Sequence, residues 1–329
     1  MAVTLGMFEK SYEHIGARLT ALGLDIDVRT FGSDGLFTVA GKKVSPAEVD
    51  LDYLWLSSHI NSDGFRDAAF KAVEACRSIG VVQTFNAGLD HPFYKALSDK
   101  GTRICNSSAQ GVAIAEYVLA QVLAVLQPIE QQRALQGAKQ WKQTPFRELS
   151  ETRWLIVGFG PIGQEIAKRV KAFGARTAVV RRSPQPSPLA DKVGTMADLG
   201  IMQGEADVVV LACSLNDETR GFANEAFFAA LKFGTILVNI ARGGLVDDAA
   251  MLKALDDGRV SKAILDVFHK EPLPAANPLW SHPSVRLTSH TSFFGTGVRA
   301  RWDNLFLDNI GRFARGQPLV SEVATKDVG

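Results

Sequence analysis

The chain has 329 residues, of which 46% are hydrophobic and 22% are charged, and its net charge at pH 7 is +1. This length and composition are typical of a globular protein with one large or two ordinary domains. A charge this close to zero argues against nucleic acid or an anionic membrane surface as a partner. The three cysteines, Cys76, Cys105 and Cys213, follow no metal-ligand spacing. We therefore expect no metal site and a reducing compartment, the cytoplasm.

The chain shows no apolar segment that suits a membrane. Its first 16 residues carry charges after only a few apolar positions, which predicts no signal peptide. The longest apolar run, residues 112–126, is interrupted by two polar residues and is too short to span a bilayer. This run predicts a buried helix and no membrane partner.

Strand and helix patterns alternate along the first third of the chain. We expect helices at residues 11–22 and 64–77 and after residue 90, and strands at residues 3–7, 25–31, 53–56, 79–85 and 102–105. Such alternation predicts a parallel sheet with right-handed crossovers. The segment up to about residue 108 is expected to form an α/β layer of its own, because a second pattern begins near residue 153.

That second pattern, residues 153–182, has the order strand, glycine turn, helix, strand. The glycines of the turn have GxGxxG spacing. Gly158 permits a tight turn, Gly160 lets the backbone approach a pyrophosphate, and Gly163 lets the helix pack closely on the strand. Pro161 suits the first helical turn and leaves the amides of Ile162 and Gly163 to face phosphates. The spacing alone is a weak signal, but with both strands around it the stretch predicts a dinucleotide-binding unit.

The end of its second strand distinguishes between cofactors. An NAD site has a carboxylate there that binds the ribose 2′-hydroxyl, whereas this strand runs into Arg181, Arg182 and Ser183. Guanidinium groups suit the dianionic 2′-phosphate of NADP. A solvated basic turn before the Pro-rich residues 183–188 is the alternative. We predict NADP(H) as the preferred cofactor, with NAD(H) possible.

Polar side chains follow several later strands as well. The apolar runs at residues 207–212, 235–240, 263–267 and 285–288 lead into loops that contain, among others, Arg242, Glu271 and His290. Singly, these residues have ordinary explanations: a surface or capping arginine, a loop acid and a core histidine. Together, just beyond the ends of separate parallel strands, they predict a catalytic site.

The segments NIARGGLVDDAAMLKALDDGRV, ILDVFHKEPLP, NPLW and LTSH together resemble the D-isomer-specific 2-hydroxyacid dehydrogenase family. NAGLD, NSSAQGVAIAEYVLA and GFGPIGQ resemble further segments, so the resemblance covers most of the chain. It implies an α/β fold of two doubly wound parallel-sheet domains, with a Rossmann NAD(P)-binding domain inserted in a flavodoxin-like substrate domain. Residues 1–108 plus 295–329 would form the substrate domain, and residues 109–294 the dinucleotide-binding domain. A homodimer through residues 112–141 of the nucleotide domains is also implied.

By this resemblance the catalytic residues are Arg242, Glu271 and His290. Arg242 would hold the carboxylate or ketone oxygen of a 2-oxo acid while the nicotinamide delivers hydride to C2. His290, as imidazolium, would give the proton that the developing alkoxide needs, and Glu271 beside it would favour the charged imidazole.

The binding residues follow the same motifs. Substrate contacts are predicted for Ser58, His59, Gly88, Arg242 and His290, because loops of this family offer backbone N–H groups to the substrate carboxylate. Cofactor contacts are predicted for the glycine turn, the basic strand end and later strand ends: Gly158, Gly160, Pro161, Ile162, Gly163, Arg181, Arg182, Ser183, Cys213, Ser214, Thr219, Ile240, Ala241, Arg242 and Asp266.

Two departures from the family pattern bear on specificity. Cys213 and Ser214 replace the usual proline, which fits a 2′-phosphate, and Phe293 and Phe294 replace small residues and would narrow or cover the substrate site. We predict an NADP(H)-preferring reductase that converts glyoxylate or hydroxypyruvate to D-2-hydroxy acids. An NAD-dependent enzyme, an enzyme for larger 2-oxo acids, and a dinucleotide-sensing protein of the corepressor type remain alternatives.

Overall fold

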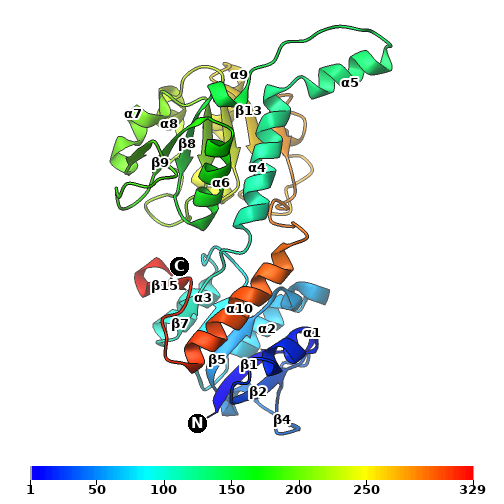
Figure 1. Ribbon diagram of the computed structural model, residues 1–329, viewed down its shortest axis with the longest axis vertical. Helices are drawn as coiled ribbons and strands as arrows, with labels where there is room; N and C mark the ends of the chain where they lie inside the picture. The colour runs from blue at the N-terminus through cyan, green and yellow to red at the C-terminus, as the bar shows by residue number, and fades with distance from the viewer. Residues whose placement is uncertain (1, 329) are drawn as a thin grey trace. The chain divides into compact units, whose positions relative to one another are not determined.

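The computed structural model describes residues 2–328, except for the side chains of Ser62 and Asp63. The chain divides into two compact units (Figure 1). Unit 1 comprises Met1–Ala109 and Thr296–Gly329, and unit 2 comprises Gln110–Gly295.

Unit 1 is built on a sheet whose described strands have the order β15-β7-β6-β5-β1-β2-β3-β4. The strands are β1 (Val3–Phe8), β2 (Ile26–Phe31), β3 (Phe37–Val39), β4 (Lys42–Val44), β5 (Asp50–Leu56), β6 (Ser78–Thr84), β7 (Arg103–Cys105) and β15 (Glu322–Val323). Strands β2, β1, β5, β6 and β7 are mutually parallel, and their order is that of the flavodoxin-like fold. The β3–β4 hairpin and β15 extend the two edges with antiparallel pairs.

Helices from both ends of the sequence build unit 1. They are α1 (Glu9–Thr20), α2 (Arg66–Glu74), α3 (Pro92–Asp99) and α10 (Val298–Ala314), with short 3₁₀ segments η1 (Pro46–Glu48), η2 (Ser58–Gly64) and η7 (Thr325–Asp327). Helix α10 belongs here because Phe306 and Ile310 join the core formed by β1, β5 and α1. The rings of Trp55 and Phe306 are stacked 4.1 Å apart.

Unit 2 contains a fully parallel sheet with the strand order β10-β9-β8-β11-β12-β13-β14 among the described residues. The strands are β8 (Arg153–Val157), β9 (Arg176–Val180), β10 (Lys192–Gly194), β11 (Val208–Leu211), β12 (Thr235–Asn239), β13 (Val260–Leu265) and β14 (Val285–Leu287). Numbered from β8, this is the 3-2-1-4-5-6 order of the Rossmann fold with one further strand.

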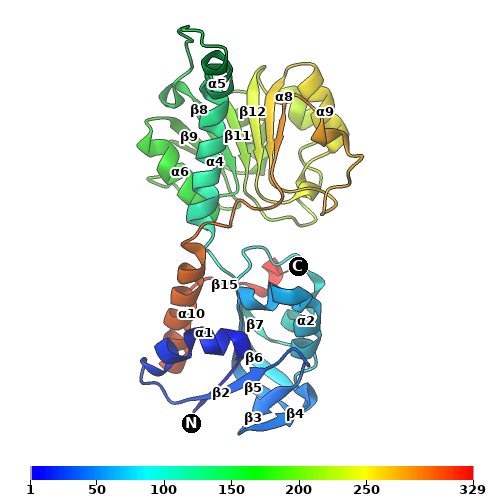
Figure 2. The same cartoon turned by 90° about the vertical axis from the view of Figure 1, so that its right-hand side faces the viewer.

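Helices cover both faces of the unit 2 sheet (Figure 2). They are α4 (Gly111–Leu126), α5 (Ile129–Gly137), α6 (Pro161–Ala172), α7 (Leu199–Gln203), α8 (Glu225–Ala230) and α9 (Asp248–Asp256); the 3₁₀ segments are η3 (Leu149–Glu151), η4 (Met196–Asp198), η5 (Gly243–Leu245) and η6 (Pro278–Trp280). Successive strand residues alternate between the faces, so that Ile156 packs with α4 and α6 whereas Leu155 packs with α7, α8 and α9.

The predicted fold class is confirmed, and the predicted apolar helix is α4. The β3–β4 hairpin was not predicted, because its strands have three residues each and carry a polar, weakly periodic sequence. Within residues 2–328, no single helix combines the length and apolar character needed to cross a membrane. Helices α4 and α5 meet that criterion only as a pair, bent by 57°.

Candidate active site

The glycine turn after β8 is closely packed on two sides and open on the third. Gly158 has φ +103°, and an added Cβ would lie 2.4 Å from the backbone nitrogen of Cys213. A Cβ on Gly163 would lie 2.1 Å from the carbonyl oxygen of Gly158. A Cβ on Gly160 would meet nothing within 4 Å. The turn is therefore held between the end of β11 and helix α6, with free space at Gly160.

Helix α6 begins at this turn. Gly160 is its N-cap, and Pro161 is the first helical residue. The amides of Ile162 and Gly163 lie in the first helical turn, where backbone N–H groups have no partner within the helix and the helix dipole is positive. The open space at Gly160 together with these donors fits the pyrophosphate of a dinucleotide.

The basic end of β9 lies beside the same turn. The guanidinium carbon of Arg181 is 5.7 Å from the ring centroid of Phe159, which stands between the first two glycines. The backbone N–H of Arg181 donates to the carbonyl oxygen of Gly194 on neighbouring β10, over 2.9 Å. Arg182 and Ser183 follow and are exposed. The strand end thus places a cation next to the glycine turn.

The loop after β11 forms a further part of this edge. Cys213 is partly buried, and burial raises the pKa of its thiol to about 11, so the thiol is neutral near pH 7. The hydroxyl of Thr219 donates to the carbonyl oxygen of Ser214 over 2.7 Å and is itself buried within the loop. Thr219 therefore shapes the loop, while Ser214 is exposed.

Arg242 follows β12 and is held through its backbone by Asn239. The amide nitrogen of Asn239 donates to the carbonyl oxygen of Arg242 over 2.9 Å, and its amide oxygen accepts from the N–H of Ala241 over 3.1 Å. Nη1 of Arg242 donates to the Ala241 carbonyl oxygen over 2.7 Å. Ile240 and Ala241, which precede Arg242, are buried. Sequence reasoning missed Asn239 as a positioning residue, although it occupies the last strand position before the arginine.

His290 and Glu271 form a direct pair. Nδ1 of His290 lies 2.8 Å from Oε2 of Glu271, and the side chains are 40% and 33% exposed. Oε1 of Glu271 accepts from the backbone N–H of Phe268 over 2.9 Å, which fixes the carboxylate. Because a carboxylate only accepts, Nδ1 carries a hydrogen, and Nε2 is the ring atom left to exchange a proton. His290 has φ +50°, in the left-handed region that is unusual for a residue with a side chain.

Asp266 holds the segment that carries His290. Its carboxylate is completely buried and accepts from the hydroxyl of Thr288 over 2.5 Å. It also accepts from the backbone N–H groups of Thr291 and Ser292, over 2.9 and 3.0 Å. Tyr117 of α4 lies 2.7 Å from the Thr288 hydroxyl. Asp266 thus has a positioning role that the sequence did not predict, and its contact with the cofactor stays a prediction.

Two aromatic residues lie next to His290. The rings of His290 and Phe293 meet edge to face at 5.9 Å, and Phe293 stacks on Phe294 at 4.4 Å. Phe294 is 73% exposed. The two rings therefore present an aromatic surface beside the imidazole.

The remaining predicted substrate residues lie in unit 1. Ser58 and His59 begin η2, one residue beyond the end of β5, and Gly88 lies in the loop after β6. Strands β5 and β6 are parallel neighbours, so these loops lie at one edge of the unit 1 sheet. All three residues are partly exposed. Arg242, Glu271 and His290 all lie at the carboxyl edge of the unit 2 sheet.

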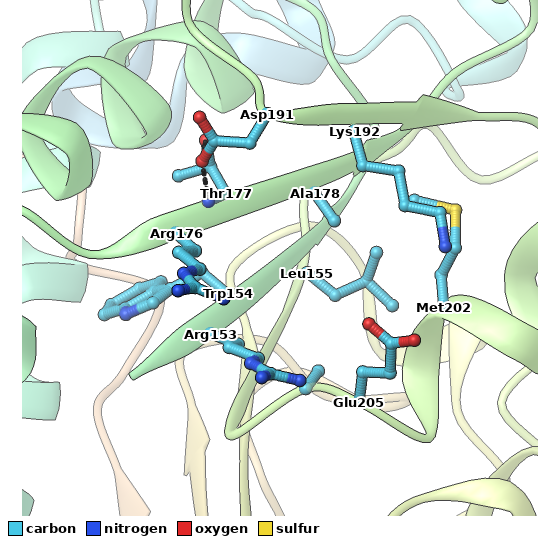
Figure 3. A pocket seen from close by; sticks show the side chains of 11 residues that line it. Arg153, Trp154, Leu155, Arg176, Thr177, Ala178, Asp191, Lys192, Met202 and Glu205 are labelled. Carbon is cyan, nitrogen blue, oxygen red and sulfur yellow. Dashed lines mark hydrogen bonds between the residues drawn. The ribbon is translucent and has the colours of Figure 1, made fainter. Parts of the chain in front are cut away.

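The opposite edge of the unit 2 sheet holds a cavity of about 280 Å³ (Figure 3). Leu155 and Met202 line its apolar part, and Arg153 and Arg176, which begin β8 and β9, lie at its polar side. This cavity is separate from the candidate active site, because the glycine turn stands at the other end of β8. Among the described residues, no group of three or more His, Cys, Asp or Glu side chains could hold a metal ion.

The parallel sheet of unit 2 has the Rossmann strand order, with an arginine and a histidine–glutamate pair at its carboxyl edge. The protein is a nicotinamide-dependent oxidoreductase. Residues 119–292 match the family model described as D-isomer specific 2-hydroxyacid dehydrogenase, NAD binding domain. The chain belongs to that family.

Curated relatives and solved structures agree with this assignment. The chain is 31% identical over 255 residues to glyoxylate/hydroxypyruvate reductase A of Klebsiella pneumoniae subsp. pneumoniae, covering 78% of this chain and 80% of that protein. It is 31% identical over 250 residues to D-3-phosphoglycerate dehydrogenase of Bacillus subtilis, covering 75% of this chain and 47% of that protein. A D-isomer specific 2-hydroxyacid dehydrogenase from Xanthobacter autotrophicus Py2, solved with NADPH and MES, has the same fold: the TM-score is 0.78 at 24% identity, with both chains fully covered.

Proposed function

We propose that the protein reduces small 2-oxo acids, glyoxylate or hydroxypyruvate, to D-2-hydroxy acids with NADPH as the preferred cofactor. The observation that carries this proposal is the pair of His290 and Glu271, 2.8 Å apart, at the same sheet edge as Arg242. The similarity of the chain to glyoxylate/hydroxypyruvate reductase A of Klebsiella pneumoniae supports this substrate class.

NADPH, when bound at the glycine turn, supplies the hydride that C2 of the substrate receives. The guanidinium of Arg242 binds the substrate carboxylate or the ketone oxygen. In the second case it stabilises the negative charge that develops on the ketone oxygen. Nε2 of His290 gives its proton to the alkoxide, and the carboxylate of Glu271 holds the ring in the orientation that exposes Nε2. In the oxidation direction the same nitrogen takes the proton from the hydroxyl group.

The proposed preference for NADPH depends on the end of β9. Residues 176–183 contain no carboxylate, and the Arg181 guanidinium lies over Phe159 of the glycine turn. A cation in this place favours a 2′-phosphate, and no acidic residue of this strand end is present to repel it. Both features support NADP(H) over NAD(H).

A homodimer in the cytoplasm is the state in which we propose that the protein works. Helix α5 projects from unit 2 (Figure 1), and none of its residues is buried. Trp141, in the segment after α5, is 99% exposed. An exposed helix followed by an exposed indole fits a second copy of the chain as partner. Sedimentation of the wild type and of Trp141→Arg would test this, with a shift of the variant toward monomer as the expected result.

The proposed activity is tested with a panel of 2-oxo acids, each with NADPH and with NADH, followed by the absorbance of the reduced nicotinamide. We expect the highest kcat/KM for glyoxylate or hydroxypyruvate with NADPH. A higher kcat/KM for an aromatic 2-oxo acid would favour the alternative that Phe293 and Phe294 accommodate a larger substrate. Equal rates with NADH would contradict the proposed cofactor preference.

A further inference from the structure

Arg242 and Glu271 lie on two loops that follow neighbouring parallel strands of unit 2. The arginine loop, residues 241–247, follows β12, and the glutamate loop, residues 266–271, follows β13. Through Oε2 of Glu271, the glutamate loop holds the imidazole of His290. The spacing of the two loops therefore decides how far the guanidinium of Arg242 lies from that imidazole.

The two loops touch through their backbones. A Cβ on Gly243, the residue after Arg242, would lie 2.0 Å from the carbonyl carbon of Phe268 and 2.3 Å from the backbone nitrogen of His269. Because Gly243 has no side chain, the arginine loop approaches the glutamate loop more closely than any other residue would permit. Such a close approach has to be held in place by contacts between the loops.

One side chain of the glutamate loop makes a hydrogen bond to the arginine loop. Nε2 of His269 lies 2.7 Å from the carbonyl oxygen of Val246. A carbonyl oxygen only accepts, so Nε2 carries a hydrogen, and the charged ring can donate in the same way. Val246 is buried, whereas the His269 side chain is 49% exposed. The imidazole thus reaches from the surface of one loop to the buried end of the other.

A carboxylate near His269 strengthens this attachment when the ring is charged. Oδ1 of Asp248, in the first turn of α9, lies 3.8 Å from Nε2. This distance is too long for a hydrogen bond, but at this range a charged imidazole is attracted to the carboxylate. The arginine loop runs directly into α9, so both contacts of His269 act on the same segment.

The arginine loop has other anchors, but they come from a different part of unit 2. The backbone N–H of Ala223 donates to the carbonyl oxygen of Leu245, and the N–H of Asp247 donates to the carbonyl oxygen of Ala223, each over 3.0 Å. Ala223 belongs to the segment after β11, and β11 and β13 lie on opposite sides of β12 in the sheet. These bonds fix the fold of the arginine loop, whereas the bond from His269 ties it to the glutamate loop.

We propose that His269 is a positioning residue of the active site, because its hydrogen bond to Val246 fixes the arginine loop against the glutamate loop. In this role it acts through the two loops and touches neither substrate nor cofactor. It sets the spacing between the guanidinium of Arg242 and the imidazole of His290. The inference rests on the proposed function, in which Arg242 binds the 2-oxo acid and His290 donates the proton.

Substitutions of His269 test the hydrogen bond. His269→Ala removes the donor, whereas His269→Gln replaces it with an amide N–H. We expect His269→Ala to lower kcat/KM for the best 2-oxo acid by about ten- to a hundredfold, since small displacements of catalytic groups have effects of this size. His269→Gln should recover most of the lost kcat/KM. The dissociation constant of NADPH should change less than kcat/KM in both variants.

The matched control is His282→Ala, because His282 also contacts a carboxylate and a backbone group in unit 2. Its Nε2 lies 3.3 Å from Oδ1 of Asp256, and its Nδ1 accepts from the backbone N–H of Ser284 over 3.1 Å. His282 precedes β14 and so lies at the amino edge of the sheet. We expect His282→Ala to keep kcat/KM, even where its midpoint of urea unfolding moves as much as that of His269→Ala.

The pH profile separates positioning from proton donation. Reduction needs a protonated His290, so kcat/KM should fall as the pH rises through the range in which that imidazole loses its proton. A positioning residue leaves this dependence in place, and we expect it in His269→Ala and His269→Gln. If His269→Gln loses this pH dependence and as much turnover as His290→Asn, His269 is itself the proton donor and the inference is overturned.

Amide hydrogen exchange decides the inference without any measurement of activity. In the arginine loop, the N–H groups of Leu245 and Val246 donate to the carbonyl oxygens of Arg242 and Gly243, over 3.3 and 3.0 Å. These amides should exchange faster in His269→Ala than in the wild type, with His269→Gln close to the wild type. If the wild type reduces no 2-oxo acid, the proposed function fails and this measurement still applies. Equal exchange in all three proteins, or a kcat/KM that survives His269→Ala, would overturn the inference.

Discussion

The two edges of the unit 2 sheet both carry charged networks, but they differ in exposure. At the carboxyl edge, the pair of His290 and Glu271 is 40% and 33% exposed. At the amino edge, the Asp207 side chain is only 5% exposed and accepts from Arg147, Lys232 and the backbone N–H of Arg153. Exposed groups at the first edge can meet a substrate, whereas the buried carboxylate at the second ties β11 to β8. The comparison predicts that substitutions at the first edge affect catalysis and those at the second affect stability.

The largest expected effect is at His290. His290→Asn should lower kcat by about a hundred- to ten-thousandfold, because it removes the general acid. The free energy of unfolding should change by no more than about 0.5 kcal/mol, since the side chain is 40% exposed. Steady-state kinetics, NADPH titration and urea unfolding measure the three quantities. His282→Asn, a histidine paired with Asp256 in the same unit, is the control. If turnover survives in His290→Asn, another group donates the proton.

Asp266 sharpens the comparison, because it lies at the carboxyl edge but is buried. Asp266→Asn replaces an acceptor that faces three donors with a group that is itself partly a donor. We expect a loss of about 2–4 kcal/mol in the free energy of unfolding, together with lower kcat, because the segment that carries His290 shifts. Urea unfolding and kinetics on the same samples check both. A variant as stable as the wild type would show that this carboxylate does not hold the segment.

Arg181 tests cofactor choice at the carboxyl edge. Arg181→Asp should lower kcat/KM for NADPH by about ten- to a hundredfold and leave that for NADH much less affected, on the scale of one or two charge-assisted bonds. Arg176→Asp makes the same charge change at the amino end of the same strand and is the matched control. An unchanged NADPH/NADH ratio in Arg181→Asp would contradict the predicted preference.

The smallest expected effect is at Asp207. Burial alone would raise the pKa of this carboxyl group, but hydrogen bonds from Arg147, Lys232 and the N–H of Arg153 outweigh burial, and the pKa is lowered from 3.8. A lowered pKa stabilises the folded protein above about pH 4, and this contribution is lost as the pH falls further. Asp207→Asn should cost about 1–2 kcal/mol at pH 7, with a smaller difference from wild type at pH 3, while kcat is unchanged. If Asp207→Asn lowers kcat without changing the free energy of unfolding, the contrast between a catalytic carboxyl edge and a stabilising amino edge is wrong.

Local features of the sequence were enough for much of the fold. The alternation of apolar strands and helices predicted parallel sheets, and the GxGxxG spacing predicted the turn in which Gly158 has φ +103°. The side chain of Asp247 caps α9 by accepting from the N–H groups of Ala249 and Ala250. These features depend on residues within one turn or one strand of each other, which is why they can be read without the fold.

The sequence by itself determined the class of fold, the dinucleotide turn and the types of residue at the strand ends. Tertiary structure decided which distant partners hold those residues: Asp266 accepts from the segment that carries His290, and His59 contacts Arg299, 240 positions away. The physical reason is strand order. In the Rossmann sheet β8 pairs with β9 and β11, and in unit 1 a helix from the end of the chain packs on strands from its beginning. Hydrogen bonds between such segments depend on that order and not on spacing along the chain.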